Sequence, residues 1–284
     1  MSAALARPAS GRPRGARHPS LLLGLLVLAL VLLPAAISIA WTPYPPGRLD
    51  ILHRLSGPSF PHPLGTDPFG RDLLSLLMAA ARNSTLVCLA AVGAATLLGV
   101  PLGLLAAAPG WRSTLVTRAT DLCLAFPPLL TAAMIVAAKG PGPGGEILAI
   151  GAFNVPAFVR LTRSAGLSVL NQDFVAAARI AGRGRVAVLA SHVLPNIAAT
   201  LLVQATLALA VAELSEAGLS YLGLGLPPPL PSLGRALADY QTRIFDNPLL
   251  VVAPGGIVAL LVLGFNLLGD GVRDLLDPTL VRMR

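Results

Sequence analysis

Long apolar stretches with few charges dominate the hydrophobic pattern of this chain. Residues 21–40 are twenty residues without a charge, and residues 84–108 form a second uncharged stretch. A helix that crosses a bilayer needs about 20 mostly apolar residues. Further apolar stretches follow at residues 122–138, 147–159, 197–226 and 249–268. The pattern therefore predicts an all-α polytopic membrane protein with six transmembrane helices.

Two of these stretches carry features that modify a simple span. The stretch at 147–159 is short, but Arg160 and Arg163 follow it and can extend their charged ends to the membrane interface. Pro127 and Pro128 stand near the start of the third stretch. Membrane helices tolerate proline when neighbouring groups satisfy the freed backbone, so we expect a kink there.

The basic residues set the orientation. With the N-terminus inside, the inner segments hold 14 of the 21 basic residues and the outer segments hold 7. This asymmetry follows the positive-inside rule and predicts that both termini are cytoplasmic. The net charge of +8 then reflects topology and the anionic inner leaflet rather than a nucleic-acid partner. The expected location is a membrane that the chain crosses several times.

Composition excludes several function classes. Apolar residues make up 55% of the chain and charged residues 12%, whereas soluble globular proteins carry about a quarter charged residues. Lys139, the only lysine, lies in Ala-Lys-Gly, so the chain lacks the Gly-Lys-Ser/Thr end of a phosphate-binding P-loop. Cys88 and Cys123 are too few for a zinc site of four cysteines or a disulfide scaffold. We therefore expect neither catalysis nor a bound cofactor or metal on this chain.

The same pattern predicts how the chain is divided. We expect a disordered basic cytoplasmic tail at residues 1–20, a first transmembrane helix at 21–40, an extracytoplasmic segment at 41–83, a five-helix core at 84–278 that includes a cytoplasmic loop at 164–195, and a cytoplasmic tail at 279–284. Ser38 and Ala40 also allow a signal-peptide end. Against that alternative, twenty apolar residues exceed the usual 7 to 15 of a signal core.

The cytoplasmic loop is the longest inner connection and should carry structure of its own, because structureless loops of this length are uncommon. Asp173 is the expected N-cap of a helix over residues 174–181, and Gly182 suits the left-handed position that ends it. A second helix is expected at 185–192, before the sequence Val-Leu-Pro-Asn ends it.

Four motifs in this order resemble those of one transporter family. Asp-Phe-Val-Ala-Ala-Ala-Arg-Ile-Ala-Gly at 173–182, with His-Val-Leu-Pro-Asn at 192–196, resembles the "EAA" loop of permease subunits from ABC-type importers. The segments at 64–72, 216–225 and 266–278 resemble the second (C-type) permease subunits of dipeptide, oligopeptide and nickel importers. The usual glutamate of the loop motif is Ala176 here.

The resemblance implies a type I ABC importer permease fold and a set of partners. These are a homologous second permease, two cytoplasmic ATPase subunits that carry ATP and Mg, and an extracytoplasmic solute-binding protein. It also implies that the loop seats on the ATPase. The residues to which this role is carried over are Asp173, Phe174, Ala176, Ala177, Ala178, Arg179, Gly182, His192, Leu194 and Pro195.

Glu213 and Glu216 are expected to line a translocation path or form a gate, because carboxylates at membrane depth are costly and often functional. An interfacial role that caps the following loop is the alternative. Dipeptide or oligopeptide import by alternating access is the expected function. Import of nickel or a metal chelate is an alternative on the same architecture. An ion-coupled secondary transporter is more distant because no internal repeat is visible, and a membrane enzyme would need a catalytic group that the spans do not show.

Overall fold

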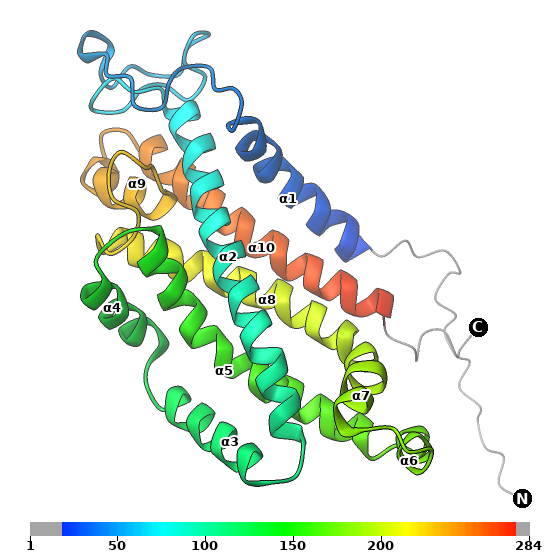
Figure 1. Cartoon of the computed structure of the whole chain (residues 1–284). Coiled ribbons are helices and arrows are strands. Elements are labelled where there is room, and N and C mark those ends of the chain that lie inside the picture. Colours follow the sequence, from blue (N-terminus) through cyan, green and yellow to red (C-terminus); the bar gives the residue numbers. More distant parts are fainter. Residues whose placement is uncertain (1–18, 277–284) are drawn as a thin grey trace, which may run out of the picture.

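The computed structural model describes residues 19–276, which form a bundle of long helices (Figure 1). The helices are α1 (Pro19–Ile37), α2 (Leu73–Ala107), α3 (Trp111–Leu124), α4 (Pro128–Lys139), α5 (Pro143–Leu170), α6 (Asp173–Ile180), α7 (Arg185–Val188), α8 (Leu194–Tyr221), α9 (Leu233–Tyr240) and α10 (Leu249–Leu276), with short turns η1 (Ile51–His53), η2 (Leu189–Val193) and η3 (Gln241–Arg243). Within these residues the only strand-like pairing is an isolated bridge between Thr66 and Asp72. The predicted all-α class is confirmed. The tails predicted at 1–20 and 279–284 lie outside the described residues, except that Pro19 and Ser20 begin α1.

The described residues form five or six of the predicted spans, depending on whether one bent pair of helices counts as a span. Among residues 19–276, five helices are long and apolar enough to cross a membrane, and α7, η2 and α8 together make one of them. The pair α3 and α4 counts as a sixth if it is one span, although its two halves are bent by 92°. The bend falls at Pro127 and Pro128, where the missing N–H groups prevent a continuous helix and Pro128 starts the next one.

Two helices extend beyond the apolar stretches that predicted them. α2 starts at Leu73, inside the predicted extracytoplasmic segment, and α5 continues to Leu170, inside the predicted cytoplasmic loop. The carboxylate of Asp72 accepts a hydrogen bond from the backbone N–H of Ser75 at 2.8 Å, which caps the start of α2. The predicted stretches were bounded by Arg82 and Arg160, so the apolar first turns of α2 before Arg82 and the last turns of α5 after Arg160 were missed.

The bundle is organised around two close helix pairs, α2 with α5 and α1 with α10, while α8 packs against α5, α10 and α2. Small residues allow α2 to approach α5 closely. A Cβ atom on Gly103 would lie 2.5 Å from the Thr162 Cβ, and one on Gly99 would lie 2.6 Å from the Phe158 Cβ. Close backbone approach at small residues is a common way for membrane helices to associate.

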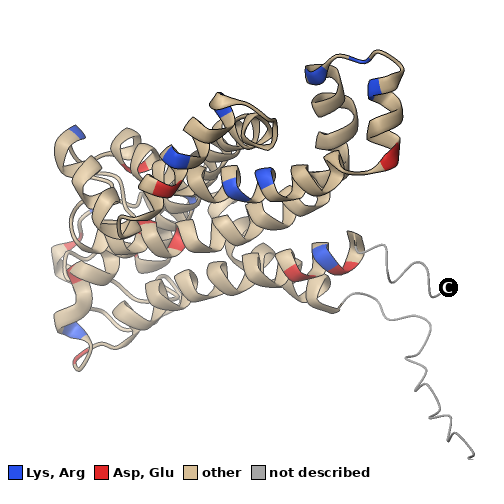
Figure 2. Ribbon diagram, turned by 90° about the horizontal axis from the view of Figure 1, so that it is seen from below, with Lys and Arg blue, Asp and Glu red and all other residues tan. Residues whose placement is uncertain are grey.

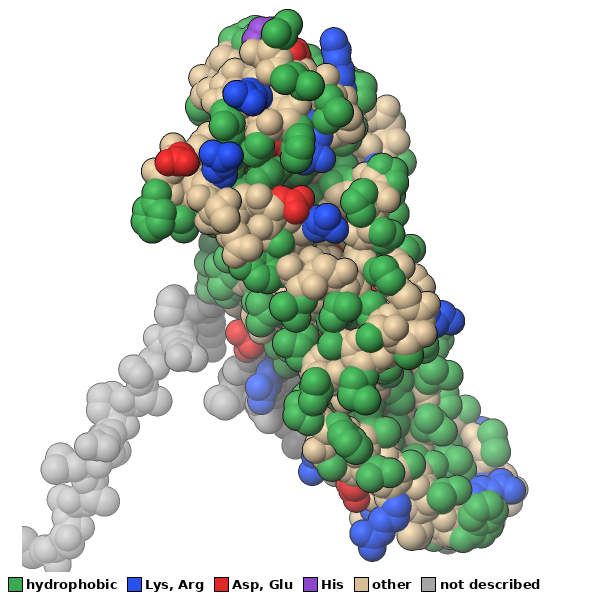
Figure 3. Space-filling view, turned by 90° about the vertical axis from the view of Figure 1, so that its left-hand side faces the viewer, with side chains coloured by type: hydrophobic (Ala, Val, Ile, Leu, Met, Phe, Trp, Pro, Cys, Tyr) green, Lys and Arg blue, Asp and Glu red, His purple; other side chains and the backbone are tan. Residues whose placement is uncertain are grey.

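The surface agrees with a membrane location. In Figure 3 the charged side chains gather toward the two ends of the molecule, with a largely hydrophobic band between them. Figure 2 shows that long parts of the helices carry no charge. Large apolar side chains such as Leu26, Leu97 and Leu214 are more than half exposed on α1, α2 and α8. Such faces suit contact with lipid or with another membrane subunit.

Candidate functional sites

The segment between α1 and α2 folds into a polar network that is tied to α9; residues 41–72 and α9 are called the outer cap below. Asp67 is fully buried, and its carboxylate accepts hydrogen bonds from the backbone N–H groups of Phe69 and Arg71, both at 2.8 Å. The Arg71 Nε donates to it at 2.6 Å, and the Tyr240 hydroxyl donates to it at 2.9 Å. Burial, followed by the neighbouring carboxylate of Asp67, raises the pKa of the Tyr240 hydroxyl far above its ordinary value, so this group remains a donor.

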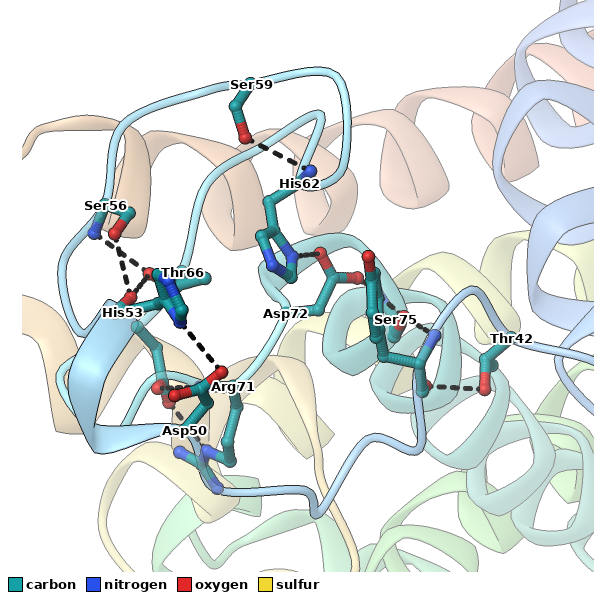
Figure 4. A network of polar contacts seen from close by, with 12 residues as sticks. Thr42, Asp50, His53, Ser56, Ser59, His62, Thr66, Arg71, Asp72 and Ser75 are labelled. Carbon is teal, nitrogen blue, oxygen red and sulfur yellow. Dashed lines mark hydrogen bonds and ion pairs between the residues drawn. The ribbon is translucent and has the colours of Figure 1, made fainter.

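A second part of the outer cap fixes the start of α2 (Figure 4). The His62 Nδ1 lies 2.9 Å from one oxygen of the Asp72 carboxylate. The other oxygen accepts from both the backbone N–H and the hydroxyl of Ser75, at 2.8 and 2.6 Å. The backbone N–H of Tyr44 donates to the Ser75 hydroxyl at 3.0 Å. The motif at 64–72 was identified in the sequence only by its resemblance to importer permeases. In the structure its residues make the hydrogen bonds that hold the outer cap together.

Three glutamates meet inside the bundle below the outer cap; Glu146, Glu213 and Glu216 are called the acidic cluster. Their exposed fractions are 0%, 1% and 0%. The hydroxyl oxygen of Ser220 lies 2.9 Å from the Glu216 Oε1 and 3.3 Å from the Glu146 Oε1, so it bridges α8 and α5. Glu213 lies beside Thr85 and Cys88 of α2. The sequence indicated Glu213 and Glu216 but missed Glu146, whose only signal is its position after the outer turn Pro-Gly-Pro-Gly-Gly.

The chain after α8 folds back over the acidic cluster; residues 222–234 are called the seal. A Cβ atom on Gly225 would lie 1.8 Å from the Ser220 Oγ, and one on Gly234 would lie 2.1 Å from the Ala217 carbonyl oxygen. The Asn83 side-chain amide also donates to the Pro231 carbonyl at 2.8 Å. Neither Glu213 nor Glu216 reaches the surface of the described chain. A path-lining role for them stays a prediction, and in this conformation both are sealed inside the bundle.

The predicted coupling residues fall on α6, on the turn after it and on the junction of η2 with α8. α6 begins one residue earlier than expected: Gln172 holds the N-cap position, and Asp173 is the first helical residue. The predicted capping role of Asp173 is therefore wrong. Its carboxylate still lies in the first turn, where a negative charge interacts favourably with the helix dipole. Gly182 has φ of +81°, which confirms the left-handed position expected for it.

The second part of the cytoplasmic loop differs from the prediction. α7 ends at Val188, and η2 is a π-helical turn that continues directly into α8, so the chain does not break at Val-Leu-Pro-Asn. Pro195 has no backbone N–H, and a wider π turn before it accommodates the missing hydrogen bond. The Asn196 side-chain amide donates to the His192 carbonyl at 2.7 Å. The predicted helix end becomes a bulge within one long helix.

Side chains of α6 and η2 hold the cytoplasmic loop together and leave one face free. The ring of Phe174 stacks on that of His192, with 6.4 Å between ring centres and 20° between planes. Val175 and Val188 are buried and belong to one hydrophobic cluster. Of the predicted residues, His192, Leu194 and Ala178 are half-buried, whereas Asp173, Phe174, Ala176, Ala177, Arg179, Gly182 and Pro195 are exposed.

The exposed face of the cytoplasmic loop combines apolar and basic side chains. Ile180 is 88% exposed and Val186 is 79% exposed, and sequence reasoning assigned neither of them a role. Arg179, Arg183 and Arg185 line a hollow beside the end of α2, where the Arg185 Nη2 donates to the Pro109 carbonyl at 2.7 Å. Two exposed apolar side chains next to arginines make a surface suited to protein contact.

Comparison with known proteins identifies the class of protein that this fold and these motifs define. Residues 99–282 match the family described as the inner membrane component of binding-protein-dependent transport systems, and the chain belongs to that family. It is 40% identical over 258 residues to a dipeptide transport system permease protein of Alkalihalophilus pseudofirmus. This alignment covers 90% of this chain and 85% of the relative. The chain is 42% identical over 266 residues to a di/tripeptide transport system permease protein of Pseudomonas aeruginosa, covering 91% and 88%. A putative peptide transport system permease protein of Brucella abortus is 37% identical over 264 residues, covering 93% and 89%.

Family membership confirms the resemblance that the sequence motifs indicated. The chain is a permease component of an ABC transport system and has the type I importer permease fold. It is a multi-pass protein of the bacterial inner membrane. As a membrane component of a transport system, it works together with other subunits.

Proposed function

We propose that this chain is one of two membrane-spanning subunits of an ATP-driven importer and that the imported solutes are dipeptides or short oligopeptides. The observation that carries this proposal is identity of 40% and 42%, over about nine tenths of the chain, to permeases named for dipeptides and for di- and tripeptides. The names of these relatives favour peptides over the alternative of nickel or a metal chelate.

The energy source lies on other chains. The single lysine has no P-loop around it, so ATP and its Mg ion bind to two separate cytoplasmic ATPase subunits. An extracytoplasmic binding protein delivers the solute, and a homologous permease supplies the other half of the channel. The two permeases then alternate between outward-open and inward-open states as the ATPases close and release.

The cytoplasmic loop transmits this motion. Ligand-driven change requires contacts that differ between two global states, so the ATPase must hold this chain at a surface that moves with the spans. The loop meets that requirement because η2 continues into α8 without a break and α6 is held to η2 by the stack of Phe174 on His192. Ile180 and Val186 enter the ATPase groove, and Arg179 stands beside them. Ala176 contributes a small surface where relatives with the usual glutamate place a carboxylate.

The proposal is tested by uptake in cells that express the complete system or the system without this chain. Uptake of a radiolabelled dipeptide should require this chain and the binding protein, whereas uptake of radioactive nickel should not change. Purification through a tag on this chain should bring down a second permease and two ATPase subunits. Nickel uptake that depends on the chain, with no peptide uptake, would replace the proposed substrate, and recovery of the chain without ATPases would overturn the assembly.

A further inference from the structure

The acidic cluster places three carboxyl groups in one sealed part of the bundle, and no basic side chain among residues 19–276 compensates their charge. Cys88 of α2 is the other titratable group that faces the cluster, and its thiol supplies no cation. The basic side chains of the neighbouring elements are engaged or located elsewhere. Arg82 of α2 donates to the Ser38 carbonyl and the Asn83 side chain. Lys139 at the end of α4 is exposed, and Arg235 pairs with Asp239 on α9. Arg273 lies near the inner end of α10 together with Asp270 and Asp274.

Hydrogen bonding within the cluster is incomplete if all three groups are carboxylates. The Ser220 hydroxyl has one hydrogen, yet its oxygen lies within 3.3 Å of two carboxyl oxygens, so it can donate to only one of them. In the part of the chain that the structure describes, the Glu146 Oε2, the Glu216 Oε2 and both oxygens of Glu213 have no hydrogen-bond partner. The hydroxyl of Thr85, a residue only 5% exposed that faces Glu213 from α2, also has none.

Charge and geometry together indicate which species neutralises the three carboxyl groups of the acidic cluster. A buried carboxylate without a partner is very costly in a medium of low dielectric constant, and three of them repel one another as well. A metal ion could neutralise them, but within residues 19–276 no three acidic, histidine or cysteine side chains converge in a way that could hold one. Protons need no coordination shell. A protonated carboxyl group also gains a donor, which can satisfy a neighbouring oxygen such as those of Ser220 and Thr85.

We propose that Glu146, Glu213 and Glu216 form a proton-binding site in the membrane-spanning core, and that the protons held there keep the outer ends of α5 and α8 joined beneath the seal. In the neutral form the cluster is a hydrogen-bonded contact between two helices through Ser220. In the ionised form the same groups repel one another across that interface. The site thus makes contact between α5 and α8 dependent on pH, whichever solute is carried.

The sign of the pH effect follows from proton binding. The folded chain holds protons that the unfolded chain releases near neutral pH, since an exposed glutamate has an ordinary pKa of about 4.3. Stability falls with rising pH wherever the folded state binds more protons than the unfolded state. The melting temperature of the purified complex should therefore fall as the pH is raised from neutral to alkaline.

Infrared spectroscopy tests the proton directly. The complete complex in lipid nanodiscs should show the C=O stretch of protonated carboxyl groups at neutral pH, and E213Q and E216Q should each remove part of this band. D246N, which neutralises an exposed carboxylate on the outer surface, is the matched control and should leave the band unchanged. A band that is absent in the wild type, or unchanged in all the glutamine variants, overturns the proposal. This readout requires no transport, so its failure is distinct from failure of the proposed function.

The pH profile separates a proton site from a merely structural role. Glutamine mimics a neutral carboxyl group and stays neutral in the unfolded chain as well. E213Q/E216Q should therefore fold, melt at or above the wild-type temperature at neutral pH and lose the alkaline decline of the wild type. E146Q should show the same change in smaller degree, and D246N should keep the wild-type slope. Variants that decline in parallel with the wild type would contradict the proposal. So would a melting temperature of E213Q/E216Q far below that of the wild type at neutral pH, because the wild-type groups would then have to be charged.

Discussion

The carboxylate of Asp67 accepts a hydrogen bond from the Tyr240 hydroxyl at 2.9 Å, although the two residues are 173 positions apart in the chain. This contact joins the motif before α2 to the last residue of α9, and both groups are buried. The same carboxylate receives two backbone N–H groups and the Arg71 side chain. The segment before α2 is therefore tied to α9 within the outer cap by one buried carboxylate that accepts four hydrogen bonds.

The link between Asp67 and Tyr240 should contribute measurably to stability. Hydrogen bonds to charged groups contribute about 1.5–3 kcal/mol, and Y240F removes one without creating a large cavity. We expect the low end of that range, because Asp67 keeps its three other donors. The melting temperature should fall by about 2–4 °C for each kcal/mol lost. In a double-mutant cycle, Y240F should have little further effect in a D67N background; additive effects would show that the two residues act independently.

Substitution of Gly103 tests the close approach of α2 to α5. G103A places a Cβ atom 2.5 Å from the Thr162 Cβ, and overpacking of this kind costs about 1–3 kcal/mol. Gly93 of the same helix is the matched control, because nothing lies within 4 Å of a Cβ atom there. G93A should be neutral or stabilise the helix by up to about 1 kcal/mol. Equal melting temperatures for the two variants would contradict the described packing.

The seal should fail when Gly225 gains a side chain. G225A would place a Cβ atom 1.8 Å from the Ser220 Oγ and so displace either the seal or the hydroxyl that bridges α8 and α5. We expect lower stability and loss of peptide uptake in cells. The control is G256A in α10, where nothing lies within 4 Å. Cysteine-accessibility labelling of Ser220→Cys should increase in the G225A background, and unchanged labelling would count against the seal.

Changes on the exposed face of the cytoplasmic loop should uncouple ATP hydrolysis from uptake. I180D puts a charge on a side chain that is 88% exposed, so folding and membrane insertion should be preserved. The complex should lose transport and stimulation of its ATPase by the loaded binding protein. R179A should act in the same direction more weakly, and R243A, an arginine on the outer side, is its control. Transport at the wild-type rate in I180D would exclude this face as the contact with the ATPase.

The sequence predicted the fold class and the five continuous spans because both depend on the length of apolar stretches; the sixth predicted span is the bent pair of α3 and α4. It predicted Gly182 correctly because a positive φ has a strong residue preference. The ends of the helices were harder to predict from the sequence. α2 begins at Leu73 because Asp72 caps it, whereas the predicted stretch began only after Arg82 and Asn83.

The missed features depend on contacts between distant segments. Nothing in the local sequence around Glu146 shows that it lies near Ser220, which is 74 positions away. Likewise, the helix break expected near Pro195 became a π turn because the helix could widen and continue into α8. The sequence also did not show that Ile180 is exposed, because an isoleucine in an eight-residue helix is usually assigned to the buried face. Packing, not local propensity, decided all three.

Reconstitution in proteoliposomes tests the central claim most directly. The chain would be reconstituted alone, and also with the second permease, both ATPases and the binding protein, and accumulation of a labelled dipeptide would be measured with and without ATP. The account predicts uphill uptake only in the complete system with ATP, and neither uptake nor ATP hydrolysis by the chain alone. Accumulation of the dipeptide against its gradient by the isolated chain would contradict it.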